Sequence, residues 1–255
     1  MIVREAQFFL IALQFLTRIR IKPIDPFPDD WLPRSAKYMP LVGAIVGGVA
    51  GAVVLASAAF FPADVPVVIG LAAAVLLTGA LHEDGLADTA DAFGGGNTRA
   101  RCLEIMKDSR IGTYGVLALV AALGLKGTSL AAIDPMSVAR VLIAGHAGAR
   151  LAAVLALAAL PYAGGDNAKV SRTSSAMTKG ELVIAVVTAV IVGFFALDAA
   201  IFAVAAVAAA AAATIIGLLA RRKIGGFTGD VLGAIEQVCE TAFVTVAAAL
   251  IACPG

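Results

Sequence analysis

Long apolar runs separated by short polar breaks fill the chain from residue 41 onward. About 20 apolar residues suffice for a helix to cross a bilayer, and most of these runs approach or exceed that length. The pattern therefore predicts about seven membrane-spanning helices. Their expected ranges are 41–61, 66–81, 113–133, 136–160, 182–197, 199–220 and 231–252.

The first 21 residues carry a shorter apolar run, which Gln7 and Gln14 interrupt and Thr17 and Arg18 end. The run is too short to be expected to span. Arg4 followed by an apolar core also resembles a signal peptide, but no cleavage site with small residues follows. We therefore expect an interfacial or re-entrant helix here rather than a leader.

The composition agrees with a protein embedded in the lipid bilayer. Hydrophobic residues make up 60% of the 255 and charged residues 15%, against about 45–50% and about 25% in soluble domains. We expect a single all-α domain over residues 1–255, a polytopic transmembrane helix bundle. The net charge of +1 gives no reason to expect a nucleic-acid partner. A homo-oligomer is compatible with the sequence.

The distribution of basic residues predicts the orientation. Of the 19 Lys and Arg, 16 lie in the N-terminal 40 residues and in three polar segments, at 82–112, 162–181 and 221–223. The loops that alternate with these segments carry none. By the positive-inside rule, the basic segments face the cytoplasm.

The most polar stretch of the chain begins directly after the second apolar run. Asp84, Asp88 and Asp91 are spaced i, i+4 and i+7, so a helix places them on one face. Three carboxylates this close repel one another unless a cation compensates them. Mg²⁺, which prefers oxygen ligands and retains waters, is the natural partner. His82 flanks this face as a candidate proton acceptor or as a structural residue.

Basic residues follow within twenty positions. Arg99, Lys107 and Arg110 lie close in sequence to the acidic face and to the glycine-bearing turn IGTYG. Such side chains bind phosphate oxygens, and Arg makes paired bonds to them. The alternative is that they merely mark the cytoplasmic side.

A second polar island begins near residue 225 with GGFTGD. Thr228 and Asp230 open the last helix, whose N-terminal dipole favours anions. Asp230, Gln237 and Glu240 then fall on one stripe of that helix. A carboxylate at Glu240, almost three turns in, is costly unless it faces the bundle interior. We therefore expect Asp230 and Glu240 to act at the same site as Asp84. His146 and Arg150 must also face inward, and they are compatible with pairing to acids.

These motifs resemble those of a known family, the cobalamin synthases or adenosylcobinamide-GDP ribazoletransferases. The resemblance rests on HEDGLADTAD, on LEIMKDSRIGTYG and on GGFTGDVLGA with Glu240, and the opening FLTRI and YMPLVGAIVGG are similar too. The chain departs from the family's usual pattern at Glu83, Ala92 and Gln237. The resemblance covers the chain nearly end to end.

The resemblance implies a Mg²⁺-dependent membrane transferase of cobalamin biosynthesis. Its substrates would be adenosylcobinamide-GDP and α-ribazole or the 5′-phosphate of α-ribazole. The ribazole hydroxyl would attack the phosphate joined to cobinamide, and GMP would leave. Lys107 and Arg110 would contact phosphates, with Arg99, Thr228 and Glu240 as further candidates. The proton acceptor would be His82 or an aspartate. The metal ligands would be Asp84, Asp88, Asp91 and Asp230.

Two other classes fit part of the pattern. A membrane prenyltransferase also binds a diphosphate through Asp-x-x-x-Asp and Mg²⁺, but it usually carries a second Asp-rich motif, to which only Asp230 and Glu240 correspond. An ion-coupled transporter would place acids near the middle of the bilayer. The acidic cluster here is expected at a cytoplasmic end instead.

Overall fold

The structure is a computed structural model that describes residues 2–21, 30–62, 64–164 and 177–253. The described residues are almost entirely helical, and no strand occurs among them apart from one isolated bridge between Tyr162 and Phe227. This confirms the predicted all-α class.

Among the described residues, six helices are long and apolar enough to cross a membrane. Each corresponds to one of the predicted spans, with ends that differ by a few residues. They are α3 (Met39–Ser57), α7 (Thr113–Ala131), α8 (Pro135–Ala159), α10 (Lys179–Ala196), α11 (Ala199–Lys223) and α12 (Gly229–Ala252).

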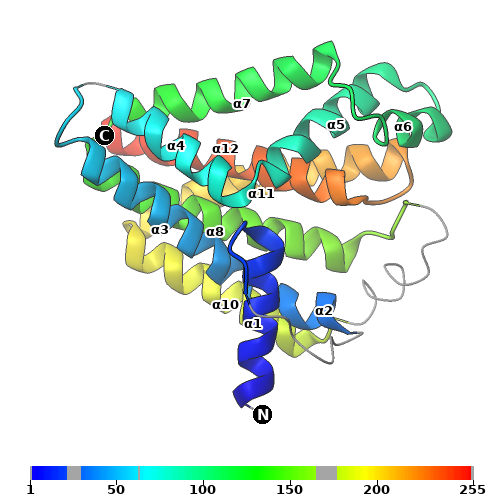
Figure 1. The fold of residues 1–255 in the computed structure, drawn as a ribbon, viewed down its shortest axis with the longest axis horizontal. Coiled ribbons are helices and arrows are strands. Elements are labelled where there is room, and N and C mark those ends of the chain that lie inside the picture. Colours follow the sequence, from blue (N-terminus) through cyan, green and yellow to red (C-terminus); the bar gives the residue numbers. More distant parts are fainter. Residues whose placement is uncertain (1, 22–29, 63, 165–176, 254–255) are drawn as a thin grey trace.

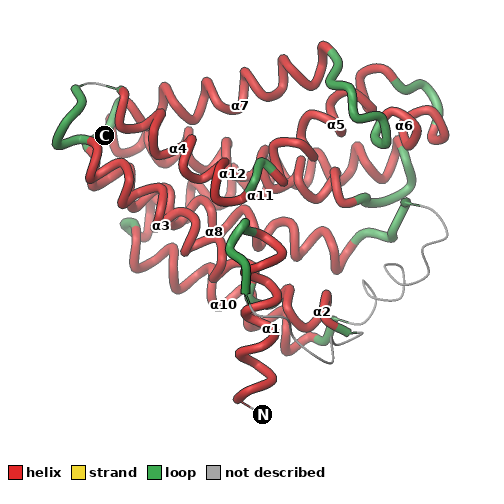
Figure 2. Tube along the Cα trace, viewed as in Figure 1, coloured by secondary structure: helices red, strands yellow, loops and turns green. Residues whose placement is uncertain are grey.

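The long helices run back and forth along one direction (Figure 1). The residues that follow α3, α7 and α10, at 58–62, 132–134 and 197–198, lie at one end with the end of α12, as the tube in Figure 2 also shows. The opposite end holds α5 (Leu81–Gly95), α6 (Arg99–Ile105) and the turn between α11 and α12. Two of the predicted basic segments, 82–112 and 221–223, therefore gather at that end.

Side-chain caps fix where several of these helices begin. Asp134 accepts hydrogen bonds from the backbone N–H groups of Met136 and Ser137 at the start of α8. Thr178 and Glu181 form a reciprocal capping box at the start of α10, and Asp198 caps α11. Polar residues in otherwise apolar sequence thus satisfy backbone donors that would be costly to leave unpaired near lipid.

The seventh predicted span is interrupted. α4 (Val65–Thr78) has 14 residues and is followed after a short break by α5, at an angle of 89°. Gly79 and Ala80 both have positive φ, at 71° and 60°, which turns the chain sharply. The backbone N–H of Arg18 donates to the Leu77 carbonyl at 2.7 Å. One of the carbonyls that α4 leaves free is thereby satisfied.

The N-terminal helix α1 (Ile2–Leu16) is too short to belong to the set of six spans. Figure 1 shows it running across the long helices rather than along them, with the short α2 (Trp31–Ala36) beside it. Lys37 and Tyr38 both bind the Glu5 carboxylate, at 2.7 and 2.6 Å. These contacts join α1 to the start of α3.

The outer surface of the bundle is apolar. Large side chains such as Phe195 and Leu76 are 89% and 74% exposed. Exposure on this scale, spread over several helices, is typical of a surface that faces lipid rather than water.

The closest helix packing joins α3 to α8 through glycines. A Cβ atom on Gly47 would lie 2.4 Å from the Leu142 carbonyl oxygen, and one on Gly43 would lie 2.3 Å from that of His146. Gly48, the next residue after Gly47, has nothing within 4 Å of such an atom. Small residues thus let the two backbones approach, as in other bundles in lipid.

Gly47 and Gly48 give a matched test of this packing. We expect Gly47→Val to lower the free energy of unfolding by about 1–3 kcal/mol or more, because its side chain overpacks the α3–α8 contact. Gly48→Val should leave the midpoint of thermal unfolding in detergent nearly unchanged. Equal midpoints for the two variants would contradict the packing described.

Candidate active site

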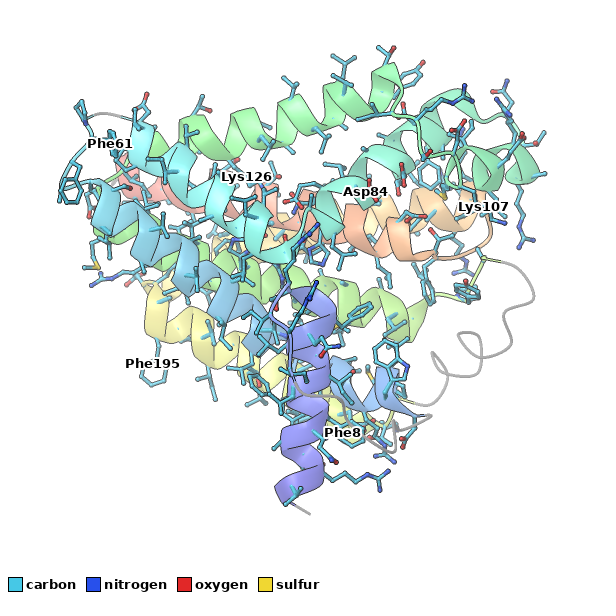
Figure 3. The ribbon with its side chains drawn as sticks, in the orientation of Figure 1. Phe8, Phe61, Asp84, Lys107, Lys126 and Phe195 are labelled. Atoms are coloured by element: carbon cyan, nitrogen blue, oxygen red, sulfur yellow. The ribbon has the colours of Figure 1, made fainter. Side chains whose placement is uncertain are left out.

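The three aspartates predicted to share a face lie on α5 as expected. Asp84 is exposed, and Asp88 and Asp91 are half-buried. In Figure 3, Asp84 lies near the middle of the molecule, between Lys126 on one side and Lys107, which lies toward one end. The face therefore begins near the middle of the bundle at exposed Asp84 and continues along α5 toward the end that holds α6.

The last helix brings the fourth aspartate to this face. Thr228 caps α12 by accepting a hydrogen bond from the backbone N–H of Val231 at 3.2 Å. The backbones of α5 and α12 then pass very close together, since a Cβ atom on Gly85 would lie 2.7 Å from the Asp230 carbonyl oxygen. Gly85 directly follows Asp84. The structure thus brings together two polar segments that are far apart in the sequence.

The electrostatics of the cluster favour a cation. Among the described residues, none of the four aspartates takes part in an ion pair. Asp88 lies outside the six long spans, and partial burial together with the charges of Asp84, Asp230 and Asp91 raises its pKa to about 6. A set of carboxylates without a basic partner fits a hard divalent ion. The exposure of Asp84 leaves room for the waters that Mg²⁺ retains.

Besides its predicted role as a metal ligand, Asp91 has a structural role that its spacing in the sequence did not indicate. Its two carboxylate oxygens accept hydrogen bonds from the backbone N–H groups of Gly112 and Gly115, at 2.6 and 2.9 Å. A Cβ atom on either glycine would lie 2.5 Å from this carboxylate. Asp91 therefore holds the start of α7, and the glycines of the IGTYG turn make room for it. Its role as a metal ligand stays a prediction.

The predicted phosphate-binding side chains lie around α6. Lys107 is exposed and follows α6 directly, while Arg99 opens that helix and lies 3.5 Å from the Ala163 carbonyl oxygen. Arg110 pairs with Asp108 at 2.7 Å, and these bonds lower the pKa of the Asp108 carboxyl to about 2. The guanidinium of Arg110 is largely exposed and remains accessible to an anion.

Lys223 is a basic residue near the site that the sequence did not single out. Its ammonium group donates to the carbonyls of Phe93 and Gly96, at 3.0 and 3.2 Å. These carbonyls lie at the C-terminal end of α5, where a cation is favourable. Lys223 thus joins the end of α11 to the end of α5, a contact that no local pattern could predict.

The structure places Glu240 away from the aspartates, in a buried charge network. We use this name for Glu83, Lys126, His146, Arg150, Glu236, Gln237 and Glu240. Glu240 lies ten residues from Asp230, about 15 Å along α12. Lys126 lies 2.9 Å from its Oε1, and His146 Nδ1 lies 2.7 Å from its Oε2. The predicted contact of Glu240 with substrate stays a prediction.

Sequence reasoning missed Glu236, which is fully buried and pairs with Arg150. A usable signal was nevertheless present. Lys126 and Arg150 stand inside apolar spans, and a buried cation in a membrane bundle requires an acidic partner. The predicted pairing of His146 and Arg150 with acids is confirmed.

His146, Glu236 and Glu240 also have ligand atoms that lie within 4.8 Å of one another. Arg150 already bonds both glutamates, with Nη1 3.1 Å from Glu240 Oε2. A guanidinium thus holds the position that a metal ion would need. We assign this trio to charge pairing rather than to metal binding.

His82 lies at the first turn of α5, between the network and the acidic face. Its Nδ1 lies 3.6 Å from Glu236 Oε2, and the side chain is buried. This position is compatible with both roles considered for it, structural partner and proton acceptor.

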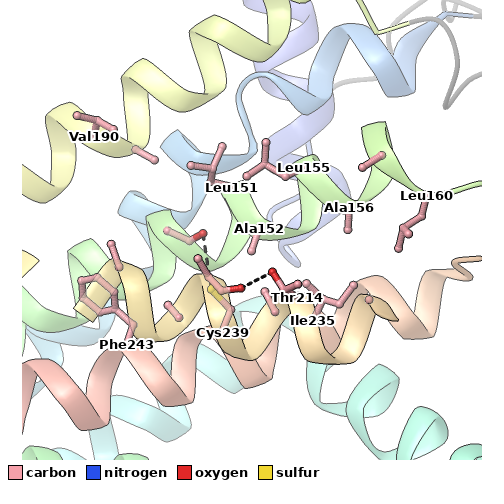
Figure 4. A pocket seen from close by; sticks show the side chains of 18 of the residues that line it. Leu151, Ala152, Leu155, Ala156, Leu160, Val190, Thr214, Ile235, Cys239 and Phe243 are labelled. Atoms are coloured by element: carbon pink, nitrogen blue, oxygen red, sulfur yellow. Dashed lines mark hydrogen bonds between the residues drawn. The ribbon is translucent and has the colours of Figure 1, made fainter. Parts of the chain in front are cut away.

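A cavity of about 460 Å³ lies elsewhere in the bundle, between α8, α10, α11 and α12. Figure 4 shows its lining, which is almost wholly apolar, with Leu151, Phe243 and Cys239 among the residues. Cys239 Sγ lies 4.0 Å from the Gly148 carbonyl oxygen. None of the predicted site residues lines this cavity, so it is not the candidate site.

Comparison with known proteins identifies the family. The sequence model of cobalamin-5-phosphate synthase matches residues 8–248. The chain belongs to the cobalamin-5-phosphate synthase family. No solved structure matches it.

Curated relatives agree with this assignment. A protein of Leptothrix cholodnii, named adenosylcobinamide-GDP ribazoletransferase, is 42% identical over 253 residues and 94% of each chain. Proteins of the same name from Bradyrhizobium diazoefficiens and Shewanella amazonensis are 41% and 39% identical over more than nine tenths of each chain. The resemblance predicted from the motifs is thereby confirmed. The comparisons give no support to a prenyltransferase or a transporter.

The hydrogen bonds of Asp91 and the exposure of Asp84 lead to opposite expectations for stability. In metal-free detergent solution, Asp91→Ala should lower the free energy of unfolding by about 1.5–3 kcal/mol, because two backbone N–H groups lose a charged acceptor. Asp84→Ala should leave stability unchanged or raise it, because it removes a repulsive charge. Thermal unfolding of both variants measures the difference, and an equal loss in both would refute the role given to Asp91.

Proposed function

We propose that this chain is an adenosylcobinamide-GDP ribazoletransferase of the bacterial inner membrane. Membership of the family and the names of relatives that cover nearly the whole chain support the activity. The observation that carries the proposal is the approach of α5 to α12, which gathers four aspartates without a basic partner among the described residues.

The bound metal would be Mg²⁺, with Asp84, Asp88 and Asp230 as its main ligands. Asp91 keeps lone pairs free on both oxygens and faces the same cluster. Bound there, Mg²⁺ would neutralise the charge of the substrate's diphosphate. Because Mg²⁺ is usually held by few carboxylates together with substrate phosphates, an open face of aspartates suits it better than a closed cage.

The remaining residues would bind and orient the diphosphate. Lys107, Arg99 and Arg110 would contact its oxygens from the side of α6 and hold the phosphorus for attack in line with the leaving group. The hydroxyl of α-ribazole, or of its 5′-phosphate, would form a new P–O bond at the phosphorus joined to cobinamide. The P–O bond to GMP would break, and the hydroxyl proton would pass to His82 or to an aspartate.

The site would face the cytoplasm. The described basic segments at 82–112 and 221–223 share one end of the bundle with α5 and α6. The positive-inside rule assigns that end to the cytoplasm, where nucleotide substrates occur.

The activity is tested directly with purified protein. We expect adenosylcobinamide-GDP and α-ribazole to yield GMP and adenosylcobalamin in the presence of Mg²⁺, with no turnover after chelation by EDTA. Release of GMP is followed by chromatography. A folded protein that releases no GMP with either form of ribazole would refute the proposed activity.

The metal-binding face is tested by Asp84→Asn. We expect turnover to fall by about 100-fold or more, because the variant loses a metal ligand and with it several kcal/mol of charge stabilisation. Asp64→Asn is the matched control, since Asp64 is also exposed but lies at the other end of the bundle. Normal turnover by a folded Asp84→Asn protein would remove Asp84 from the site.

A further inference from the structure

The buried charge network described above joins four helices directly behind the candidate active site. Lys126, Arg150, Gln237 and Glu240 are each 2% exposed or less, and Glu236 is fully buried. Glu83 comes from α5, Lys126 from α7, and His146 and Arg150 from α8, while the other members come from α12. None of these residues is needed for the chemistry proposed above, so their presence in a membrane bundle calls for a physical reason.

Gln237 holds the central place between α5, α7 and α12. Its Nε2 donates to Glu83 and to Glu236, at 3.1 Å each. Its Oε1 accepts a hydrogen bond from Lys126 at 2.9 Å. Only an amide both donates and accepts in this way, and a carboxylate at this position would face Glu83 and Glu236 with like charge.

Glu83 and Gln237 lie on the same two helices as the metal-binding aspartates proposed above. Glu83 precedes Asp84 directly and points about 100° away from it around α5. Gln237 lies two turns after Asp230, on the same stripe of α12. Any sliding of α5 along α12 that separates Glu83 from Gln237 therefore also shifts Asp84 and Asp88 relative to Asp230.

The closest part of the α5–α12 contact resists such sliding poorly. It is made by glycines, since a Cβ atom on Gly233 would lie 3.3 Å from the Cα atom of Gly85 and from that of His82. His82 also approaches Glu236 across this contact, but at 3.6 Å the pair is beyond hydrogen-bond distance. Two backbones in smooth contact lack the interlocking side chains that usually fix helix register. A buried polar bond is the kind of contact that selects one register.

We propose that Glu83 and Gln237 are positioning residues, which set the register of α5 on α12 and thereby the spacing of the metal-binding aspartates. This inference rests on the proposed Mg²⁺ site. It assigns neither residue a contact with the metal or the substrate.

The carboxylate of Glu83 and the amide of Gln237 can be exchanged between the two positions. In the double variant Glu83→Gln/Gln237→Glu, the amide on α5 donates to the carboxylate on α12, and Lys126 still meets an acceptor. The repulsion from Glu83 is removed, whereas the repulsion from Glu236 remains. The number of charges in the network is unchanged. Gln237→Glu alone places three carboxylates together, whereas Glu83→Gln alone removes one charge from the network.

The experiment compares the original protein with both single variants, the double variant and Glu104→Gln, an exposed control whose ion pair within the described part of the chain is with Arg101. Two quantities are measured in detergent: the rise in the unfolding midpoint with Mg²⁺ concentration, and the Mg²⁺ concentration that gives half-maximal release of GMP. The first reports binding without turnover.

We expect Gln237→Glu to weaken apparent Mg²⁺ affinity by about tenfold or more in both measurements, as loss of an outer-shell partner typically does. The double variant should recover the part of that loss that comes from Glu83, and Glu104→Gln should behave like the original protein. Should Gln237→Glu fail to fold, the double variant must still fold and bind Mg²⁺ better than Glu83→Gln does.

Three results would overturn the inference. The first is a lower unfolding midpoint in the single variants with an unchanged dependence of that midpoint on Mg²⁺ concentration. The second is a double variant whose apparent Mg²⁺ affinity is no higher than that of the weaker-binding single variant. The third is a double variant that does not fold. If the original protein itself shows no response to Mg²⁺, the proposed metal site fails first, and that outcome is distinct from the other three.

Discussion

The contact between α5 and α12 at Gly85 and Gly233 is the constraint on which the candidate site depends. Without side chains at these positions, two helix backbones pass close enough for Asp230 to join the aspartates of α5. Carboxylates brought this close are stable only with a compensating cation. The same proximity that costs electrostatic energy in the protein alone suits the divalent ion that we propose for this site.

The surroundings of this contact separate two kinds of charge. On one side, Asp84 and Asp88 have no basic partner among the described residues; Asp84 is exposed and Asp88 is half-buried. Behind, Glu236 and Glu240 are fully paired with Arg150 and Lys126 and have almost no exposure. Unpaired acids thus remain where water and substrate can reach them, and paired acids lie where hydrocarbon or protein surrounds them.

Much of this arrangement could be predicted from the sequence because its signals are local. Apolar run lengths gave the six long helices, and the i, i+4, i+7 spacing gave the face of Asp84, Asp88 and Asp91. The bend at Gly79 and Ala80 could not be predicted, since an alanine with positive φ is held by its surroundings. The bonds from Asp91 to Gly112 and Gly115, the pairing of Glu236 with Arg150 and the contacts of Lys223 all join distant segments. Their partners become visible only once the helices are packed.

The sharp turn between α4 and α5 also sets the depth at which chemistry occurs. A helix of 14 residues measures about 21 Å, which is about two thirds of the hydrocarbon thickness of a bilayer. α4 alone is therefore shorter than a full crossing, and the chain turns by 89° into α5 before completing one. In the proposed function, a diphosphate would meet Asp84 in the first turn after this bend, on the exposed side of a short helix whose other side packs on the buried charge network. The charges on that packed side act in a lower dielectric than Asp84 does.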